Sequence, residues 1–348
     1  MRRVVLVLVV LGVASGFAVR VAPARAAATA ASAATASAAE LARADFDDDG
    51  FVDLAVGVPG EDVEAHDGAG AVVVLYGSDA GLTGAGAQLF HQDLPEIADR
   101  AEAGDAFGAA LASGDFDADG FADLAVGIPG EDQGQSVDLG GVLLLFGTAG
   151  GLTAAGSHGL FTEAEPGDRF GAALAAGLVD GDGFVDLAAG LPGTDVRGAA
   201  DAGSVVMIAS AGDSDRRFLQ GPGVGGMAEP GDRFGAALAA ADLNGDGRSD
   251  LAAGAPGEDV GAAADAGSVI YVPGSTGGLP TGGGRLFAQG LGGLGGVAER
   301  GDHFGAALEA GAANTDGPAD LVVGAPGEAV GTAAGSGAVG VLYGSPGG

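Results

Sequence analysis

Short apolar runs separated by clusters of glycine, aspartate and proline recur along most of the chain. Residues 71–76 read Ala-Val-Val-Val-Leu-Tyr, and residues 268–272 read Ser-Val-Ile-Tyr-Val. Runs of this kind, rich in β-branched residues and bounded by turn residues, are typical of β-strands. The alanine-rich runs are too short for helices, and glycine and proline interrupt them at once. The pattern therefore predicts an all-β protein.

One long unit is repeated five times. The string Asp-Leu-x-x-Gly-x-Pro-Gly begins at Asp53, Asp123, Asp186, Asp250 and Asp320. A Phe-Gly-Ala-Ala-Leu string precedes the last four copies, beginning at Phe107, Phe170, Phe234 and Phe304. In the first copy Ser37-Ala38 stands at the place of Phe-Gly. Self-similarity at such a long period indicates stacked structural repeats.

Each repeat contains four candidate strands. They are the Phe-Gly-Ala-Ala-Leu segment, the Asp-Leu-x-x-Gly segment, a run such as 71–76 and a shorter run such as 88–90. Repeats of four short antiparallel strands favour a β-propeller of about five blades over residues 40–348, as a closed or an incomplete ring. The first repeat keeps a remnant of its first strand, and the last has no fourth strand. A parallel β-helix is the alternative, but its repeats are much shorter.

An aspartate-rich loop lies between the first two predicted strands of each repeat. Oxygen side chains at loop positions 1, 3, 5 and 9, with the backbone carbonyl at position 7, can converge on one hard cation, and glycine at position 6 permits the sharp turn. These positions hold Asp45, Asp47, Asp49, Phe51 and Asp53 in the first repeat; Asp115, Asp117, Asp119, Phe121 and Asp123 in the second; and Asp242, Asn244, Asp246, Arg248 and Asp250 in the fourth. Calcium takes six to eight such oxygens, so Ca²⁺ is the cofactor expected in these three loops.

The other two loops are incomplete. The third keeps Asp180, Asp182 and Asp186 but has Leu178 at position 1, and it is open whether it binds a cation or forms only a polar turn. The fifth has Ala312 at position 1, and here the polar turn is favoured.

Phe-Gly paired with Gly-x-Pro across an acidic loop resembles the FG-GAP repeat of the integrin α-subunit N-terminal β-propeller and its bacterial relatives. The motif is literal at Gly254-Ala255-Pro256 and Gly324-Ala325-Pro326. The resemblance covers residues 40–348, with five repeats where integrin propellers have seven. It implies a calcium-binding module for binding or adhesion, whose calcium loops have the same short form. Integrin α-subunits use the face opposite these loops for partner contact.

That opposite face, by the connectivity of a four-stranded blade, carries the loops between strands two and three. They include the acidic pairs Glu61-Asp62, Glu131-Asp132 and Glu258-Asp259. We expect these acids to present a negative surface to a basic or cation-bridged partner. An extracellular protein or carbohydrate is the partner class expected. The alternative is that the acids only keep the protein in solution.

The N-terminus has the pattern of a secretory signal peptide. A basic start, Met1-Arg2-Arg3, precedes an apolar run, and Ala24-Arg25-Ala26 resembles a cleavage site. We expect residues 1–26 to be a signal peptide and residues 27–39 a low-complexity leader, which makes the mature protein secreted and without a membrane span. The formal net charge of −33 argues against nucleic acid, whose phosphates need clustered cations.

No catalytic motif accompanies the repeats. The four histidines occupy unrelated repeat positions, and no cysteine, nucleophile elbow or phosphate loop is present. The sequence therefore predicts a protein that is not an enzyme. The alternatives are a secreted hydrolase or lyase on the same scaffold and a purely structural surface protein. Arg300-Gly301-Asp302 is interpreted as part of the repeat, since Pro166-Gly167-Asp168 and Pro230-Gly231-Asp232 stand at equivalent places.

Overall fold

The computed structural model describes residues 41–208, 216–221, 224–280, 282–292 and 294–346. These residues form nineteen strands and no helix. The first sheet contains β1 (Leu41–Ala42), β2 (Leu54–Val58), β3 (Ala71–Leu75) and β4 (Gln88–Phe90); the second contains β5 (Ala110–Gly114), β6 (Asp123–Ile128), β7 (Gly141–Phe146) and β8 (Thr153–Leu160). The third contains β9 (Leu174–Gly177), β10 (Asp186–Leu191), β11 (Ser204–Ile208) and β12 (Arg216–Leu219); the fourth contains β13 (Ala237–Ala241), β14 (Asp250–Ala255), β15 (Ser268–Val272) and β16 (Arg285–Phe287); the fifth contains β17 (Ala307–Gly311), β18 (Asp320–Ala325) and β19 (Ala338–Leu342).

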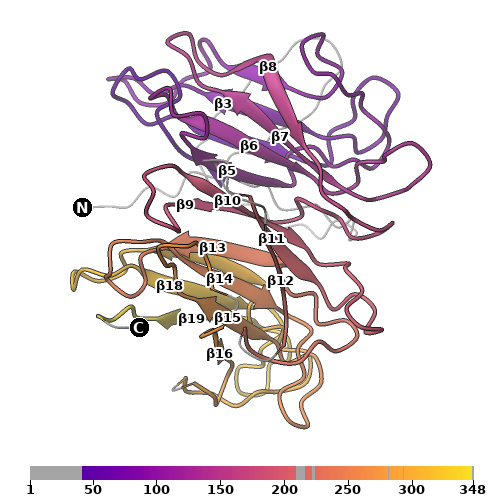
Figure 1. Cartoon of the computed structure of the whole chain (residues 1–348), viewed down its shortest axis with the longest axis vertical. Coiled ribbons are helices and arrows are strands. Elements are labelled where there is room, and N and C mark those ends of the chain that lie inside the picture. Colours follow the sequence, from indigo (N-terminus) through magenta and orange to yellow (C-terminus); the bar gives the residue numbers. More distant parts are fainter. Residues whose placement is uncertain (1–40, 209–215, 222–223, 281, 293, 347–348) are drawn as a thin grey trace.

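Each sheet is an antiparallel meander, and the sheets follow one another in chain order from indigo to yellow in Figure 1. The first strands β1, β5, β9, β13 and β17 contact one another in succession. They line a central groove of about 710 Å³, to which each sheet contributes small side chains: Ala42, Ala112, Ala175, Ala239 and Ala310. The predicted β-propeller of five blades is thus confirmed, with a short first strand in blade 1 and no fourth strand in blade 5 among the described residues.

In the second to fifth blades the first strand begins later than the sequence predicts. In the second blade β5 starts at Ala110, because the preceding Phe107-Gly108 has another role. Phe107 N–H donates to Ala69 O of the first blade at 2.8 Å, while Gly108 N–H donates to Gly127 O of its own blade at 3.0 Å. Gly108 adopts φ +85°, which the strand cannot accommodate. Phe-Gly is therefore a link between two blades rather than the start of a strand.

The Gly-x-Pro glycines lie where neighbouring blades approach most closely. A Cβ added to Gly127 would lie 2.1 Å from the carbonyl oxygen of Gly171 in the third blade. The equivalent glycines of the first, third and fourth blades would meet the next blade at 2.0 Å. The space between blades thus leaves no room for a Cβ on the Gly-x-Pro glycine. The glycine of Phe-Gly is required for a different reason, its positive φ.

The ring is not closed by the described residues, because one face of the fifth sheet is exposed. Val339 and Tyr343 are 71% and 66% exposed. The other face of this sheet, with Leu321 and Val323, is buried against the fourth blade.

Candidate cation-binding loops

The acidic loops connect the first strand of each sheet to the second. Because every sheet is a meander of the same order, all five loops emerge at the same end of the blades. Two of them bring three carboxylates together: Asp45, Asp47 and Asp49 in the first loop, and Asp115, Asp117 and Asp123 in the second. In each group one carboxylate oxygen per residue lies within 4.8 Å of the others. Within the described part of the chain these are the only such groups.

Backbone amides shape the first loop around its carboxylates. Asp45 accepts from the N–H groups of Asp49 at 3.1 Å and Gly50 at 2.9 Å, and Asp49 accepts from Phe51 N–H at 2.9 Å. Gly50 has φ +88°, as the turn at position 6 requires. The loop thus folds back on itself so that positions 1, 3 and 5 face a common centre.

The second loop has the same turns with a different carboxylate set. Asp115 accepts from Gly120 N–H at 3.1 Å, and Asp119 accepts from Phe121 N–H at 2.9 Å. Asp119 was predicted to be a ligand but lies outside the group of three, whereas the buried Asp123 belongs to it.

The aspartate at position 9 holds the blade together in addition to facing the loop. In the first blade Asp53 accepts from Phe46 N–H and from Gly77 N–H, both at 2.7 Å. Gly77 follows the third strand, so this carboxylate joins the loop to that strand. The position-9 aspartates of all five blades are at most 3% exposed. Burial and recurrence in every blade, including those with incomplete loops, show a structural role that loop spacing alone could not reveal.

In the fourth loop the candidate ligands already have other partners, among them the Arg248 side chain. Asp242 accepts from three backbone amides, among them Gly247 N–H at 2.9 Å. Asn244 Oδ1 accepts from Asp246 N–H at 2.9 Å, while its amide nitrogen donates to Asp250 at 2.9 Å. The Arg248 guanidinium lies 3.6 Å from the Asp246 carboxylate. A cation in this loop would have to share Asp246 with Arg248.

The third and fifth loops keep their turns without gathering three carboxylates. Asp180 accepts from Asp182 N–H at 2.9 Å, and Asn314 accepts from Asp316 N–H at 2.8 Å. The backbone thus forms the same polar turn where position 1 lacks a carboxylate.

Electrostatics and geometry of the first two loops fit a hard cation. Burial raises the pKa of Asp47, and the charges of Asp53 and Asp49 raise it further. Burial, with a contribution from Asp117, raises the pKa of Asp123 to about 6. Carboxylates crowded in this way are costly to ionise without a counter-charge. Carboxylate oxygens that all lie within 4.8 Å of one another can contact one calcium ion, which takes its oxygen ligands at about 2.4 Å.

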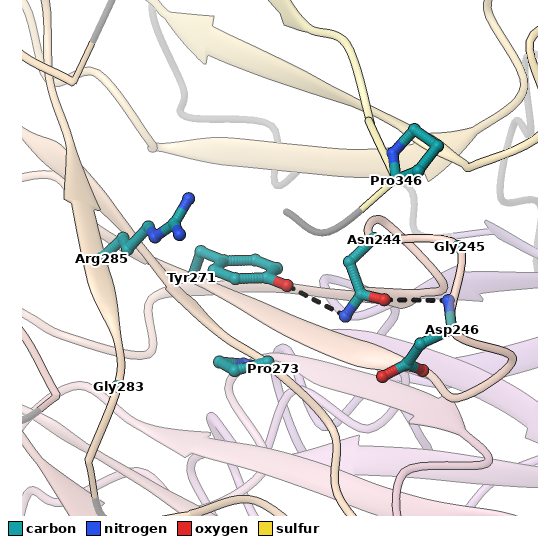
Figure 2. A pocket seen from close by; sticks show the side chains of 8 residues that line it. All are labelled: Asn244, Gly245, Asp246, Tyr271, Pro273, Gly283, Arg285 and Pro346. Carbon is teal, nitrogen blue, oxygen red and sulfur yellow. Dashed lines mark hydrogen bonds between the residues drawn. The ribbon is translucent and has the colours of Figure 1, made fainter.

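A pocket adjoins one of the acidic loops. It lies beside the fourth loop and is lined by Asn244, Asp246, Tyr271, Arg285 and neighbouring glycines and prolines (Figure 2). Its volume is about 340 Å³. The Asn244 amide donates to the Tyr271 hydroxyl at 3.2 Å, so the loop and the pocket wall are joined. Burial raises the pKa of Tyr271 to about 12, which keeps this phenol neutral.

The acids predicted to face a partner are in part buried. Glu131 is 3% exposed and Glu258 is 8% exposed. Each accepts a hydrogen bond of 2.6 Å from a glutamine in the fourth strand region of the preceding blade, Gln92 and Gln220 respectively. The expectation that both acids form a binding surface is therefore wrong, because they join adjacent blades. Asp302 of the Arg-Gly-Asp string is likewise 1% exposed, in agreement with its interpretation as part of the repeat.

The sequence itself contains a signal for these pairs. The glutamine recurs at Gln92, Gln220 and Gln289, and each faces a glutamate of the next blade. The second blade has Thr162 in place of the glutamine, and the third blade has Thr194 in place of the glutamate. Both partners change together, as contacting residues do.

The sequence of these repeats is similar to a known repeat family and to segments of three characterised proteins. The family model of the FG-GAP repeat matches residues 37–75, 107–145 and 234–272, which are the three repeats with complete acidic loops. The chain is 34% identical over 152 residues, 44% of its length, to the phosphatidylinositol-glycan-specific phospholipase D of Rattus norvegicus, of which it covers 18%. It is 32% identical over 154 residues, 43% of its length, to integrin alpha-PS2 of Drosophila melanogaster, of which it covers 10%. It is also 32% identical over 152 residues, again 43% of its length, to integrin alpha-7 of Mus musculus, of which it covers 12%. The chain thus spans less than a fifth of each of these relatives.

Proposed function

We propose that the chain, whose repeats match the FG-GAP family model and resemble the integrin α-subunit propeller, is a secreted, calcium-binding module that binds or adheres to an extracellular protein or carbohydrate. The observation that carries the proposal is the pair of acidic loops in which three carboxylates converge. The family match to the repeats with complete loops supports it independently.

The residues of the first loop have defined tasks in this proposal. Asp45, Asp47 and Asp49 hold the cation, with the Phe51 carbonyl as a further oxygen, while Asp53 ties the loop to the third strand. The ion supplies positive charge that offsets the repulsion among the carboxylates. Binding to the native state alone stabilises it in proportion to the logarithm of the free calcium concentration.

We place the partner-binding surface on the loops between the second and third strands, at the end of the blades opposite the acidic loops. Each of these loops closes as a tight bridge, such as Val63 with His66 and Val260 with Ala263. Asp62 and Asp259 are exposed there, unlike the buried Glu131 and Glu258. Rigid loops that carry exposed acids suit a basic or cation-bridged partner.

The enzyme alternative, a secreted hydrolase or lyase, gains little support from the pocket in Figure 2. Among its described lining residues Asp246 is the one carboxylate, and Asp246 already belongs to the fourth acidic loop. A glycosidase needs two carboxylates across the scissile bond. The phospholipase relative supports the repeat fold over the aligned segment, which is 18% of that protein.

Calcium titration of the purified protein tests the proposal. We expect calcium to raise the melting temperature, and chelator to reverse the rise. Asp47→Asn and Asp117→Asn should each reduce calcium stoichiometry by about one site. Asp180→Asn is the matched control, since it changes the same loop position where Leu178 replaces the first ligand. Identical melting curves in calcium and in chelator, or equal effects of all three variants, would contradict calcium binding.

The adhesion part needs a separate measurement. The protein would be screened against extracellular proteins and glycans with and without calcium, and any hit retested with Asp62→Asn and Asp259→Asn. We expect these variants to weaken binding without a change in melting temperature. Binding that is lost only on changing exposed acids at the opposite end, such as Asp79, would contradict the assigned face.

A further inference from the structure

The outward face of the fifth sheet is the side turned away from the fourth blade. It consists of Ala307, Glu309, Val322, Val339 and Val341, which share one side of β17, β18 and β19 by their pairing register. In Figure 1 this sheet is the last of the series, at the yellow end. The corresponding face in each of the other four blades is covered by the next blade.

Val339 shows how much this face differs from its equivalents. The residue opposite the Gly-x-Pro glycine is Val72, Val142, Val205 or Val269 in the first four blades and Val339 in the fifth. The first four valines are at most 1% exposed, whereas Val339 is 71% exposed. In the first blade a Cβ added to Gly108 of the next Phe-Gly would lie 2.8 Å from Val72. The glycine of the following Phe-Gly is thus what covers this valine.

Two glycines of the fifth blade have open space beside them, whereas the equivalent glycines of the other blades lie against the backbone of the next blade. A Cβ on Gly57, Gly127, Gly190 or Gly254 would meet a carbonyl oxygen of the next Phe-Gly at 2.0–2.1 Å, but on Gly324 it meets nothing nearer than its own blade's Ala307 at 3.3 Å. A Cβ on Gly70, Gly140, Gly203 or Gly267 would meet the next phenylalanine's backbone at 2.2–2.4 Å, but on Gly337 it meets nothing nearer than Pro326 O at 3.4 Å.

Backbone carbonyl groups that accept hydrogen bonds from the next blade's Phe-Gly link recur in the blades. The first blade receives hydrogen bonds on the carbonyls of Asp67, Gly68 and Ala69 from the link that leads into Phe107. The third blade receives them likewise from the N–H groups of Gly231, Arg233 and Phe234. The equivalent carbonyls of the fifth blade belong to residues 334–336. Among the described residues no backbone N–H donates to them.

We propose that the outward face of the fifth sheet is a docking surface for a further FG-GAP blade, supplied from outside these 348 residues, whose Phe-Gly segment packs on Val339 and in the space beside Gly324 and Gly337. The interface continues one that the chain already makes four times, so its chemistry is specified. It offers the exposed side chain of Val339, open space beside Gly324 and Gly337, and the backbone carbonyls of residues 334–336 as hydrogen-bond acceptors. A second copy of this chain does not offer the segment. Its four Phe-Gly pairs are buried in its own interfaces, and its first repeat has Ser37-Ala38 at that place.

A peptide with the sequence of residues 229–241 tests the proposal, because this segment covers the equivalent face of the third blade. Binding of the labelled peptide to the full chain would be followed by fluorescence anisotropy. We expect a Kd of about 1 mM or tighter. A peptide with alanine in place of its phenylalanine should bind at least about tenfold more weakly, which corresponds to 1.4 kcal/mol.

Gly324→Ala is the matching change in the protein. Its Cβ would occupy the place of the docking glycine's carbonyl while meeting only Ala307 in its own blade, so folding is retained and peptide binding is lost. Gly277→Ala is the control, since a Cβ there meets nothing within 4 Å. Failure of the peptide to bind the wild-type chain, or equal binding to Gly324→Ala, would overturn the proposal. A wild-type dimer in sedimentation velocity that Gly324→Ala converts to a monomer would also overturn it, in favour of a second copy as the occupant.

Discussion

Glycine at the Gly-x-Pro position should be indispensable between blades and dispensable at the open face. Gly190 of the third blade and Gly324 of the fifth occupy the same repeat position, and neither has a positive φ. An alanine Cβ at Gly190 would lie 2.0 Å from Gly235 O, whereas at Gly324 it would lie 3.3 Å from the Ala307 Cβ. The two substitutions are chemically identical and differ only in what stands opposite.

The cost at Gly190 follows from the distance. A carbon and an oxygen that are not bonded need more than 3 Å, so the third and fourth blades must separate by about 1 Å or the strands must distort. Overpacking costs about 1–3 kcal/mol when side chains can yield, and here the obstacle is backbone. The carbonyl belongs to Gly235, whose N–H also donates to Gly254 O at 2.9 Å. We therefore expect a loss of about 3 kcal/mol for Gly190→Ala, and a change within about 1 kcal/mol for Gly324→Ala.

Thermal and urea unfolding of both variants would measure the difference. A loss of about 3 kcal/mol corresponds to a fall in melting temperature of roughly 6–12 °C for a domain of this order of size. Gly324→Ala should melt within about 3 °C of wild type. Equal melting temperatures for the two variants would refute the conclusion that backbone contact between blades is what requires glycine.

Two further predictions concern other parts of the chain. Burial, together with a hydrogen bond to Asp99 and the negative charge of Asp99, raises the pKa of Glu131 to about 9. The folded state therefore binds more protons than the unfolded state, and the stability of the fold falls as pH rises from about 4.5 to 9. Glu131→Gln, which resembles the protonated acid, should flatten this fall, and melting temperatures that drop equally between pH 5 and pH 9 in both proteins would contradict the prediction. The mature chain should begin near Ala27, and mass spectrometry of the secreted protein checks this, since retention of residues 1–26 would disprove the signal peptide.

Much of the architecture could be predicted from residues that repeat at fixed distances. The recurrence of Gly-x-Pro and of the acidic loop specified the number of blades, the second and third strands of each blade, the short first strand of the first sheet and the missing fourth strand among the described residues of the last. The convergence of Asp45, Asp47 and Asp49 was also predictable, because a short loop confines its own side chains. Residues 1–40, with the predicted signal peptide and leader, lie outside the described residues.

Features that depend on contacts between blades could not be derived in this way. Glu131 and Asp132 stand side by side in the sequence as two acids, yet Glu131 is buried and Asp132 is only half-buried, because Gln92 from the preceding blade lies against Glu131. Phe107-Gly108 resembles the start of a strand, yet it bonds to two blades at once. Local spacing determines which residues form a strand or a loop, whereas burial and hydrogen-bonding partners depend on the distance at which separate sheets pack, and no short segment of sequence contains that distance.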